Sequence, residues 1–299
     1  MEHHHNHHHH SAPAQSLSGI FILSIILNGL FVLIEAGVGL WQDSLSLLSD
    51  AGHNLSDVFS LVLVLIAFRL AKVKSNEHYT YGYRKSTVLI SLLNAVILLV
   101  AVGAIVIESI HKFSEPTDVN GIAVSWTAGV GILINGVTAL LLMRGQKNDL
   151  NVRGAFLHMA ADTLVSVGVV ISGIVIVYTG WTIIDPIVSL IIAGVILIST
   201  RELLSDSLRL AVDGIPKGVD LKEIEQILLA KEHVKDAHHI HVWAISTTET
   251  ALTAHIVVDD LSQWHHVSDN LKHELEEHGI THATLEPETE DIHCHNRVC

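Results

Sequence analysis

The chain has 299 residues, with 17 Lys and Arg against 31 Asp and Glu, and 49% of its residues are hydrophobic. The most acidic part begins at Arg201, where the last 99 residues carry 8 Lys and Arg against 19 Asp and Glu. This charge excludes nucleic acid as a natural partner, because a phosphate backbone attracts positive charge. An acidic domain instead suits cations.

The first 16 residues are polar and contain seven histidines interrupted by Asn6. Such a composition predicts a disordered tail that binds metal weakly. Two origins are open. The tract is either a native metal-loading tail or an added affinity tag, although tags are usually unbroken runs.

Six apolar stretches follow, and each is long enough to cross ~30 Å of hydrocarbon as a helix. They lie near residues 17–40, 45–68, 86–110, 122–143, 153–178 and 182–201. A soluble bundle with six such segments would need a larger core than this chain can supply. The sequence therefore predicts an α-helical polytopic membrane domain with six transmembrane helices over residues 17–201.

Basic residues are concentrated in two of the five connecting loops. Residues 69–85 carry five Lys or Arg and residues 144–153 carry three, against Lys112 alone in the other three loops. The positive-inside rule places these two loops, and with them both termini, in the cytoplasm. We expect a multi-pass membrane protein, in the plasma (inner) membrane if the source is bacterial.

The remainder predicts a linker at 202–215, a small cytoplasmic α+β domain at 216–290 and a His- and Cys-rich tail at 291–299. Asp220 and Glu223 form a potential capping box at the start of a helix. Strands are expected near 236–245 and 250–259, a second helix over 264–278 ending at Gly279, and a last strand near 281–287. The order αββαβ indicates a compact, two-layer, metallochaperone-like fold.

Two apolar stretches contain the same polar motif, His-x-x-x-Asp. The second has His53 and Asp57, and the fifth has His158 and Asp162. A spacing of four residues places both side chains on one helix face. Polar groups at membrane depth usually face a bundle interior and are functional. Two such faces together supply two imidazoles and two carboxylates.

This donor set matches a tetrahedral zinc site. Magnesium prefers six oxygens and calcium more carboxylates, while copper(I) favours Cys or Met. The types of ligand alone do not exclude cobalt, cadmium or nickel. A single motif of this kind could form an ordinary hydrogen bond between helices or occur by chance. Two copies in two spans argue against a chance occurrence. Asp50, three residues before His53, belongs either to an ion path or to a structural hydrogen bond.

These motifs, the run from Ser44 to Ala51, the six spans and the acidic αββαβ tail together resemble the cation diffusion facilitator family. The resemblance covers residues 17–288 and is greatest for the zinc-transporting branch. It implies a homodimer in the lipid bilayer that exports cytosolic Zn²⁺ in exchange for protons. It also implies that His53, Asp57, His158 and Asp162 form the transport site, with broader transport of Cd²⁺, Co²⁺ or Ni²⁺ as the alternative.

The resemblance implies further metal contacts outside the membrane. Some relatives bind metal in the loop after the second span through an aspartate and two histidines. Here His78 is present, but an aromatic residue within 79–83 replaces the second histidine, which leaves His78 as a transient contact. In the cytoplasmic domain the implied regulatory zinc ligands are His238, His255, Glu288, His265 (or His266) and His282. In the tail they are His293, Cys294 and Cys299. The alternative for all of these is a solvated, His-rich surface.

Protons and zinc compete for the same imidazole and carboxylate atoms, which predicts exchange between them. No nucleotide-binding loop of the Gly-x4-Gly-Lys-Ser/Thr type occurs, so an ion gradient must supply the energy. A channel would need weak sites rather than four strong ligands. A metalloenzyme would need an open coordination position, and no His-Glu-x-x-His occurs. We therefore expect a transporter and not an enzyme.

Overall fold

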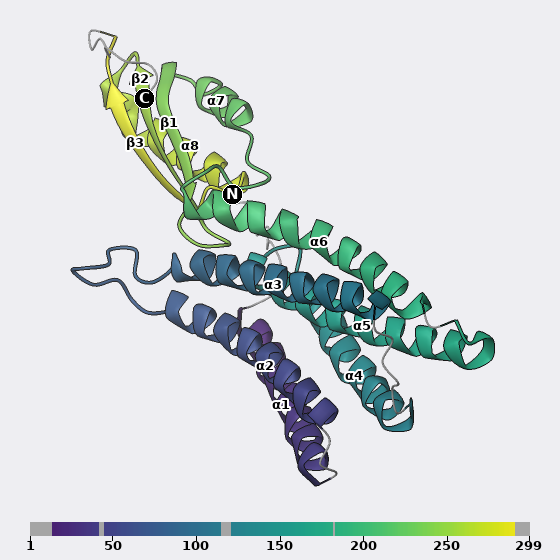
Figure 1. Cartoon of the computed structure of the whole chain (residues 1–299). Coiled ribbons are helices and arrows are strands. Elements are labelled where there is room, and N and C mark those ends of the chain that lie inside the picture. Colours follow the sequence, from purple (N-terminus) through teal and green to yellow (C-terminus); the bar gives the residue numbers. More distant parts are fainter. Residues whose placement is uncertain (1–13, 42–44, 115–120, 182, 291–299) are drawn as a thin grey trace, which may run out of the picture. The chain divides into compact units, whose positions relative to one another are not determined.

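The computed structural model describes residues 14–41, 45–114, 121–181 and 183–290, apart from some side chains within them. Figure 1 shows its helices and strands, and the chain divides into two compact units. One comprises Met1–Arg69 and Leu93–Arg201, and the other comprises Leu70–Leu92 and Glu202–Cys299. The loop after α2 therefore belongs to the same unit as the C-terminal domain.

Six long helices occupy the predicted apolar stretches. They are α1 (Ala14–Trp41), α2 (Leu45–Ala71), α3 (Ser86–Ser114), α4 (Gly121–Leu142), α5 (Leu150–Thr179) and α6 (Ile184–Ala211). Five contain a described stretch that is long and apolar enough to cross a membrane, and α4 contributes a shorter one at Gly129–Leu142. The predicted six-span membrane domain is confirmed.

The helices of the first unit pack through two apolar clusters. One joins α1, α2, α4 and α5 through side chains that include Phe21, Leu61, Leu142 and Met159. The other joins α3, α5 and α6 through Val102, Ala161, Ala193 and Ile196. Because α5 contributes to both clusters, it is packed against helices on two sides, and this packing fixes its orientation. Large apolar side chains on the outside, such as Ile198 and Leu33, are exposed as expected for lipid-facing positions.

The last of the six long helices, α6, is longer than predicted. We expected it to end at 201, but α6 continues to Ala211, so most of the expected linker at 202–215 is helical. The reason is tertiary. Leu203 and Leu210 are buried, and the Ser207 hydroxyl lies 2.8 Å from the hydroxyl of Ser91 on α3. The extended helix therefore has a buried face on which to continue.

The C-terminal domain has the predicted αββαβ order with one additional short turn. Its elements are α7 (Leu221–Leu229), β1 (Val234–Ala244), β2 (Thr250–Val258), the 3₁₀ turn η1 (Leu261–Gln263), α8 (Trp264–Glu277) and β3 (His282–Glu288). The strand order is β1-β2-β3, with β1 and β2 antiparallel and β2 and β3 parallel. The helix and strand bounds lie within two residues of those expected.

One face of this sheet is covered by α7 and α8. Ile224 and Leu228 of α7, Leu271 of α8, and Leu252 and Ile256 of β2 share one buried apolar core. The residues between these on β2, including His255, lie on the other face, as the alternation of a half-buried strand requires. The sheet therefore presents its second face without a helix from the described chain.

Both helices of the domain have defined ends. Asp220 caps α7, and its carboxylate accepts from the backbone N–H of Lys222 at 2.9 Å. A capping box would instead use the backbone N–H of Glu223. Gly279 follows α8 at φ +85°, and the N–H groups of Gly279 and Ile280 donate to Glu276 and Leu275. This is the Schellman arrangement, which favours glycine because of its left-handed backbone.

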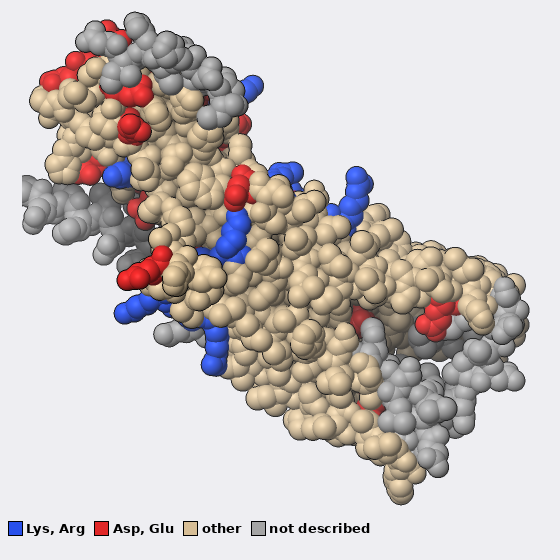
Figure 2. Space-filling model, turned by 60° about the vertical axis from the view of Figure 1, so that its left-hand side comes forward, with Lys and Arg blue, Asp and Glu red and all other residues tan. Residues whose placement is uncertain are grey.

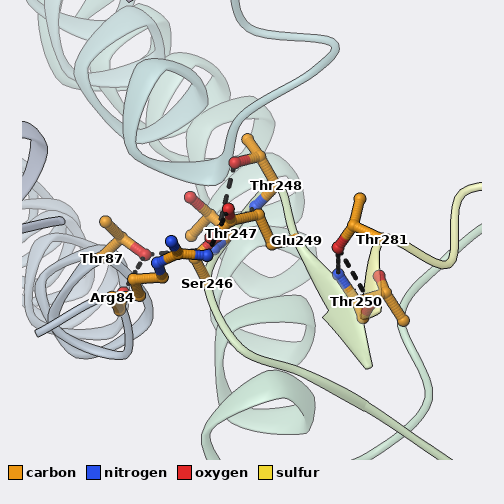
Figure 3. A network of polar contacts seen from close by, with 8 residues as sticks. All are labelled: Arg84, Thr87, Ser246, Thr247, Thr248, Glu249, Thr250 and Thr281. Atoms are coloured by element: carbon orange, nitrogen blue, oxygen red, sulfur yellow. Dashed lines mark hydrogen bonds and ion pairs between the residues drawn. The ribbon is translucent and has the colours of Figure 1, made fainter. Parts of the chain in front are cut away.

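The second unit also joins the loop after α2 to the C-terminal domain. The Lys85 ammonium donates to the carbonyls of Leu210 and Ala244 and to the carboxylate of Asp213, at 2.9, 3.0 and 2.6 Å. Figure 3 shows the turn after β1, where Arg84 lies 2.8 Å from Glu249 and the Thr247 N–H donates to the Thr87 hydroxyl. The start of α3 is thereby attached to the end of β1.

Charge on the surface follows the predicted asymmetry. On the face drawn in Figure 2, Lys and Arg side chains lie toward one end of the helices, and most of the remaining helix surface is uncharged. In the sequence the basic residues flank the end of α2, the start of α3, the end of α4 and the start of α5. These four helix termini are the ones that the positive-inside rule assigns to a single side of the membrane.

Candidate metal sites

Three of the four residues expected to form the transport site lie together between α2 and α5. Asp57, His158 and Asp162 each offer a ligand atom within 4.8 Å of the others. The Nε2 atom of His158 is 2.5 Å from Oδ1 of Asp57 and 4.0 Å from Oδ2 of Asp162. Asp57 and His158 are buried, and Asp162 is partly so. The two motif faces therefore meet inside the helical unit.

Two expected residues of this region fall outside the described side chains. The backbone of His53 belongs to α2, four residues before Asp57, but its side chain is not described. The same holds for Asp50. The placement of His53 at this site remains an expectation from the i,i+4 spacing, and the role of Asp50 on an ion path remains a prediction.

The chemistry of the described trio suits a divalent cation. Two carboxylates close to one imidazole carry excess negative charge, and such groups are stable in a buried position only when paired with protons or a cation. An imidazole nitrogen with carboxylate oxygens is also the mixed N/O set that zinc binds. The residues present therefore fit a dication as cargo.

A second polar contact supports this part of α2. The side-chain amide of Asn54 donates to Oε2 of Glu35 on α1 at 2.8 Å, and both side chains are buried. Asn54 is next to His53 and three residues before Asp57 in the same helix. The contact therefore holds α1 against the stretch of α2 that carries the motif.

A second group of potential ligands lies on the uncovered face of the C-terminal sheet. His238 of β1 and His255 of β2 are register partners, and Glu288 belongs to β3. The Glu288 carboxylate places Oε1 2.5 Å from Nδ1 of His255 and Oε2 3.3 Å from Nε2 of His238. Glu286, another carboxylate of β3, is exposed and lies 3.6 Å from His255. The geometry therefore favours Glu288, the carboxylate that the family resemblance implies, over Glu286.

The other expected ligands lie elsewhere or outside the described chain. Within the described residues, neither His265 nor His282 belongs to the group formed by His238, His255 and Glu288. His265 is highly exposed and pairs with Asp269 at 3.3 Å, and the His282 ring is 5.7 Å from that of Tyr81. His78 lies exposed in the loop after α2. The tail residues His293, Cys294 and Cys299 fall outside the described residues.

Sequence reasoning did not select His239, which lies close to the same group. Its ring centroid is 5.2 Å from that of His255 and 5.5 Å from that of His238. In a regular strand, neighbouring residues point to opposite faces. The only signal in the sequence was the His238-His239 pair itself, and strict alternation assigns its second member to the core.

Comparison with known proteins agrees with this architecture. The family model described as "Cation efflux transmembrane domain" matches residues 21–210, and that described as "Cation efflux protein, cytoplasmic domain" matches residues 216–290. The cadmium, cobalt and zinc/H(+)-K(+) antiporter of Bacillus subtilis is 37% identical over 93% of this chain and 91% of its own length. The zinc transporter ZitB of Escherichia coli is 34% identical over 89% and 86%.

A further relative, the metal cation efflux system protein CzcD of Cupriavidus metallidurans, is 34% identical over 88% of this chain and 84% of its own length. All three relatives are named as transporters, antiporters or efflux proteins, and none as an enzyme. With two matched domains in the expected order and long relatives above 30% identity, the chain belongs to the cation efflux (cation diffusion facilitator) family of membrane metal transporters.

Proposed function

We propose that this protein exports zinc from the cytosol in exchange for protons by alternating access. The observation that carries the proposal is the buried group of Asp57, His158 and Asp162, which unites two membrane-spanning helices around N and O donors. His53 is the proposed fourth ligand. The relatives support the reaction class, since their names describe efflux of zinc and other divalent metals.

The proposed coupling follows from competition at these atoms. Zinc binds neutral imidazole and ionised carboxylate, so a proton on either ligand weakens the metal. The His158 Nε2 atom lies close to a carboxylate oxygen from each motif, so a proton bound among them alters several ligands together. Protons that enter from the outer side would then release zinc there, and zinc that enters from the cytosol would displace protons.

The proposed assembly is a homodimer with both termini in the cytoplasm, in the inner membrane if the source is bacterial. The domain over 216–290 supplies the proposed dimer contact and regulatory zinc sites at His238, His255 and Glu288. His265, His282, His293, Cys294 and Cys299 remain proposed contributors, and His78 and Asp50 remain proposed contacts on the ion path. The even number of spans and the basic loops support this orientation.

A second candidate is the same transport with broader metal specificity. The Bacillus subtilis relative is named for cadmium and cobalt as well as zinc, and it is 37% identical. Two imidazoles with two carboxylates do not by themselves exclude cobalt or cadmium. We propose zinc as the principal cargo because this donor set matches its tetrahedral preference.

The test is metal uptake into proteoliposomes that contain the full chain and carry an imposed pH gradient. We expect zinc flux that saturates and depends on the gradient, and that is lost in Asp57→Ala. Glu277→Ala, an exposed carboxylate of α8, is the matched control and should transport normally. Normal flux in Asp57→Ala would remove this residue from the transport site. Flux that neither saturates nor responds to pH would indicate a channel.

A further inference from the structure

We propose that His239 is a ligand of the metal site in the cytoplasmic domain, which then binds zinc through three imidazoles and the Glu288 carboxylate. This inference rests on the proposal above that His238, His255 and Glu288 bind zinc. It adds a fourth donor and so makes the site a complete tetrahedral one within a single chain.

The backbone of β1 brings His239 to the required face. Ala237 and Val242 lie in the apolar core under α7 and α8, and Ile240 packs against that core. Strict alternation from Ala237 would therefore direct His239 into the core and Ile240 away from it. Instead the ladder between β1 and β2 has an irregularity between His238 and His241. The extra residue leaves two successive histidines on the uncovered face.

This irregularity has the backbone signature of a β-bulge. The register passes from the pair His238 and His255 to the pair His241 and Thr253, so two residues of β1 lie opposite Ala254 alone. His239 has φ +50°, a left-handed conformation that is uncommon for residues other than glycine. Bulges redirect side chains, and unfavourable backbone conformations are often found at functional sites. A glycine at this position would avoid the strain but would supply no ligand.

The spacing of the three rings matches a shared zinc ion. Zinc binds an imidazole nitrogen at about 2.1 Å, which places the ring centroids of two histidines on one tetrahedral ion roughly 5 Å apart. The ring centroids of His239 and His255 are 5.2 Å apart. The ring centroid of His238 is 5.5 Å from each of these two. His241, on the same face, is 6.4 Å from His239 and serves as a natural control.

The donor set carries a single negative charge. Glu288 is buried beside His238 and His255 and supplies one negative charge, while neutral imidazoles supply none. Three nitrogens and one oxygen form a set that zinc accepts and that magnesium and calcium do not favour. A four-ligand site of this kind leaves no open position, which is typical of structural rather than catalytic zinc.

The first experiment measures zinc affinity in the full chain, purified in detergent, by competition with a chromophoric chelator. All variants carry Asp57→Ala, Cys294→Ser and Cys299→Ser, so that the transport site and the C-terminal tail contribute little to the measured zinc binding. Asn tolerates a left-handed backbone but is a poor zinc ligand, so His239→Asn removes the donor and keeps the conformation. We expect His239→Asn to weaken zinc binding at least about tenfold, since even residues that only support ligands have effects of this size.

The control His241→Asn should bind zinc as the parent does, and His238→Ala should weaken binding strongly. If His238→Ala has no effect, the proposed site itself is wrong. If His238→Ala weakens binding and His239→Asn does not, the site stands and only the role of His239 is refuted. Cobalt provides the second readout, because loss of a ligand from a four-coordinate site changes its visible absorption in His239→Asn and not in His241→Asn.

A third measurement separates a ligand from a residue that only shapes the strand. In metal-free protein, His239→Gly should raise or maintain the thermal midpoint, because glycine relieves the left-handed strain. Added zinc should then raise the midpoint of the parent and much less that of His239→Gly. An equal zinc-induced increase in both proteins would show that His239 does not bind the metal.

Discussion

The Oδ1 atom of Asp57 lies 2.5 Å from Nε2 of His158, although the two residues are 101 positions apart in the chain. This contact connects α2 with α5, and each residue belongs to one of two identical His-x-x-x-Asp motifs. A metal bound at this proposed transport site would be shared between two helices. A movement of α5 relative to α2 would then change the coordination, as the proposed alternating access requires.

The balance of nitrogen and oxygen donors should set the choice of metal. We expect His158→Asp to lower zinc transport and to increase the relative transport of Mn²⁺, because oxygen donors favour harder ions. Competition between Zn²⁺ and Mn²⁺ in proteoliposome flux measures this ratio. His273→Asp, at an exposed histidine of α8, is the control and should leave the ratio unchanged. An unchanged ratio in His158→Asp would contradict a role for this imidazole in selectivity.

The contact between Glu35 and Asn54 should contribute to the stability of the membrane unit. Glu35→Ala removes the acceptor and leaves the buried Asn54 amide without it, which costs about 1–3 kcal/mol of unfolding free energy. Glu35→Gln keeps an acceptor oxygen and should cost less. Thermal unfolding of the two variants in detergent gives the comparison. Equal midpoints would indicate that the hydrogen bond does not determine the effect.

Local pattern was sufficient for much of the fold. Apolar length predicted all six long helices, and the local pattern of the C-terminal part predicted its αββαβ order. The i,i+4 spacing placed His158 and Asp162 on one face, and their neighbourhood with Asp57 follows from the symmetry of the two motifs. Apart from the contact with Asp57, these features depend on residues close to one another in the sequence.

The features that the sequence did not reveal depend on tertiary contacts. The extension of α6 requires Ser207 to meet Ser91 of α3, and no local signal reports this. His239 was overlooked because the ligands of this domain were inferred from a family resemblance, and no local pattern reports the bulge in β1 that brings His239 to their face. The junction between the turn after β1 and the start of α3 also joins residues distant in sequence, including Lys85 and Ala244.

Lys85 should contribute more to this junction than its neighbour Arg84. The Lys85 ammonium donates to two backbone carbonyls and one carboxylate, so Lys85→Met removes three charge-assisted bonds and should cost about 1–3 kcal/mol. Arg84 makes one half-exposed pair with Glu249, so Arg84→Met should cost less than about 1 kcal/mol. Hydrogen exchange of the amides at 245–249 should rise in the first variant only. A larger effect from Arg84→Met would reverse this assignment.

The pair of Lys231 and Glu274 predicts how acid affects the cytoplasmic domain. The hydrogen bond from the Lys231 ammonium holds the pKa of the Glu274 carboxyl below its ordinary value of 4.5. Because the folded pKa is lowered, the pair stabilises the fold above the unfolded pKa. That stabilisation is lost as the pH falls through the folded value. Lys231→Met should therefore reduce stability at pH 7 and make no difference once Glu274 is protonated in both states.

Carbon-13 NMR of the Glu274 side chain measures this effect directly. In Lys231→Met the pKa of Glu274 should rise toward 4.5, whereas in Lys272→Met, a lysine on the same helix as Glu274, it should keep its lowered value. Because Lys231 follows α7 and Glu274 belongs to α8, the shift also reports whether the two helices keep their packing in solution. A Glu274 pKa that does not move in Lys231→Met would mean that this contact does not persist there.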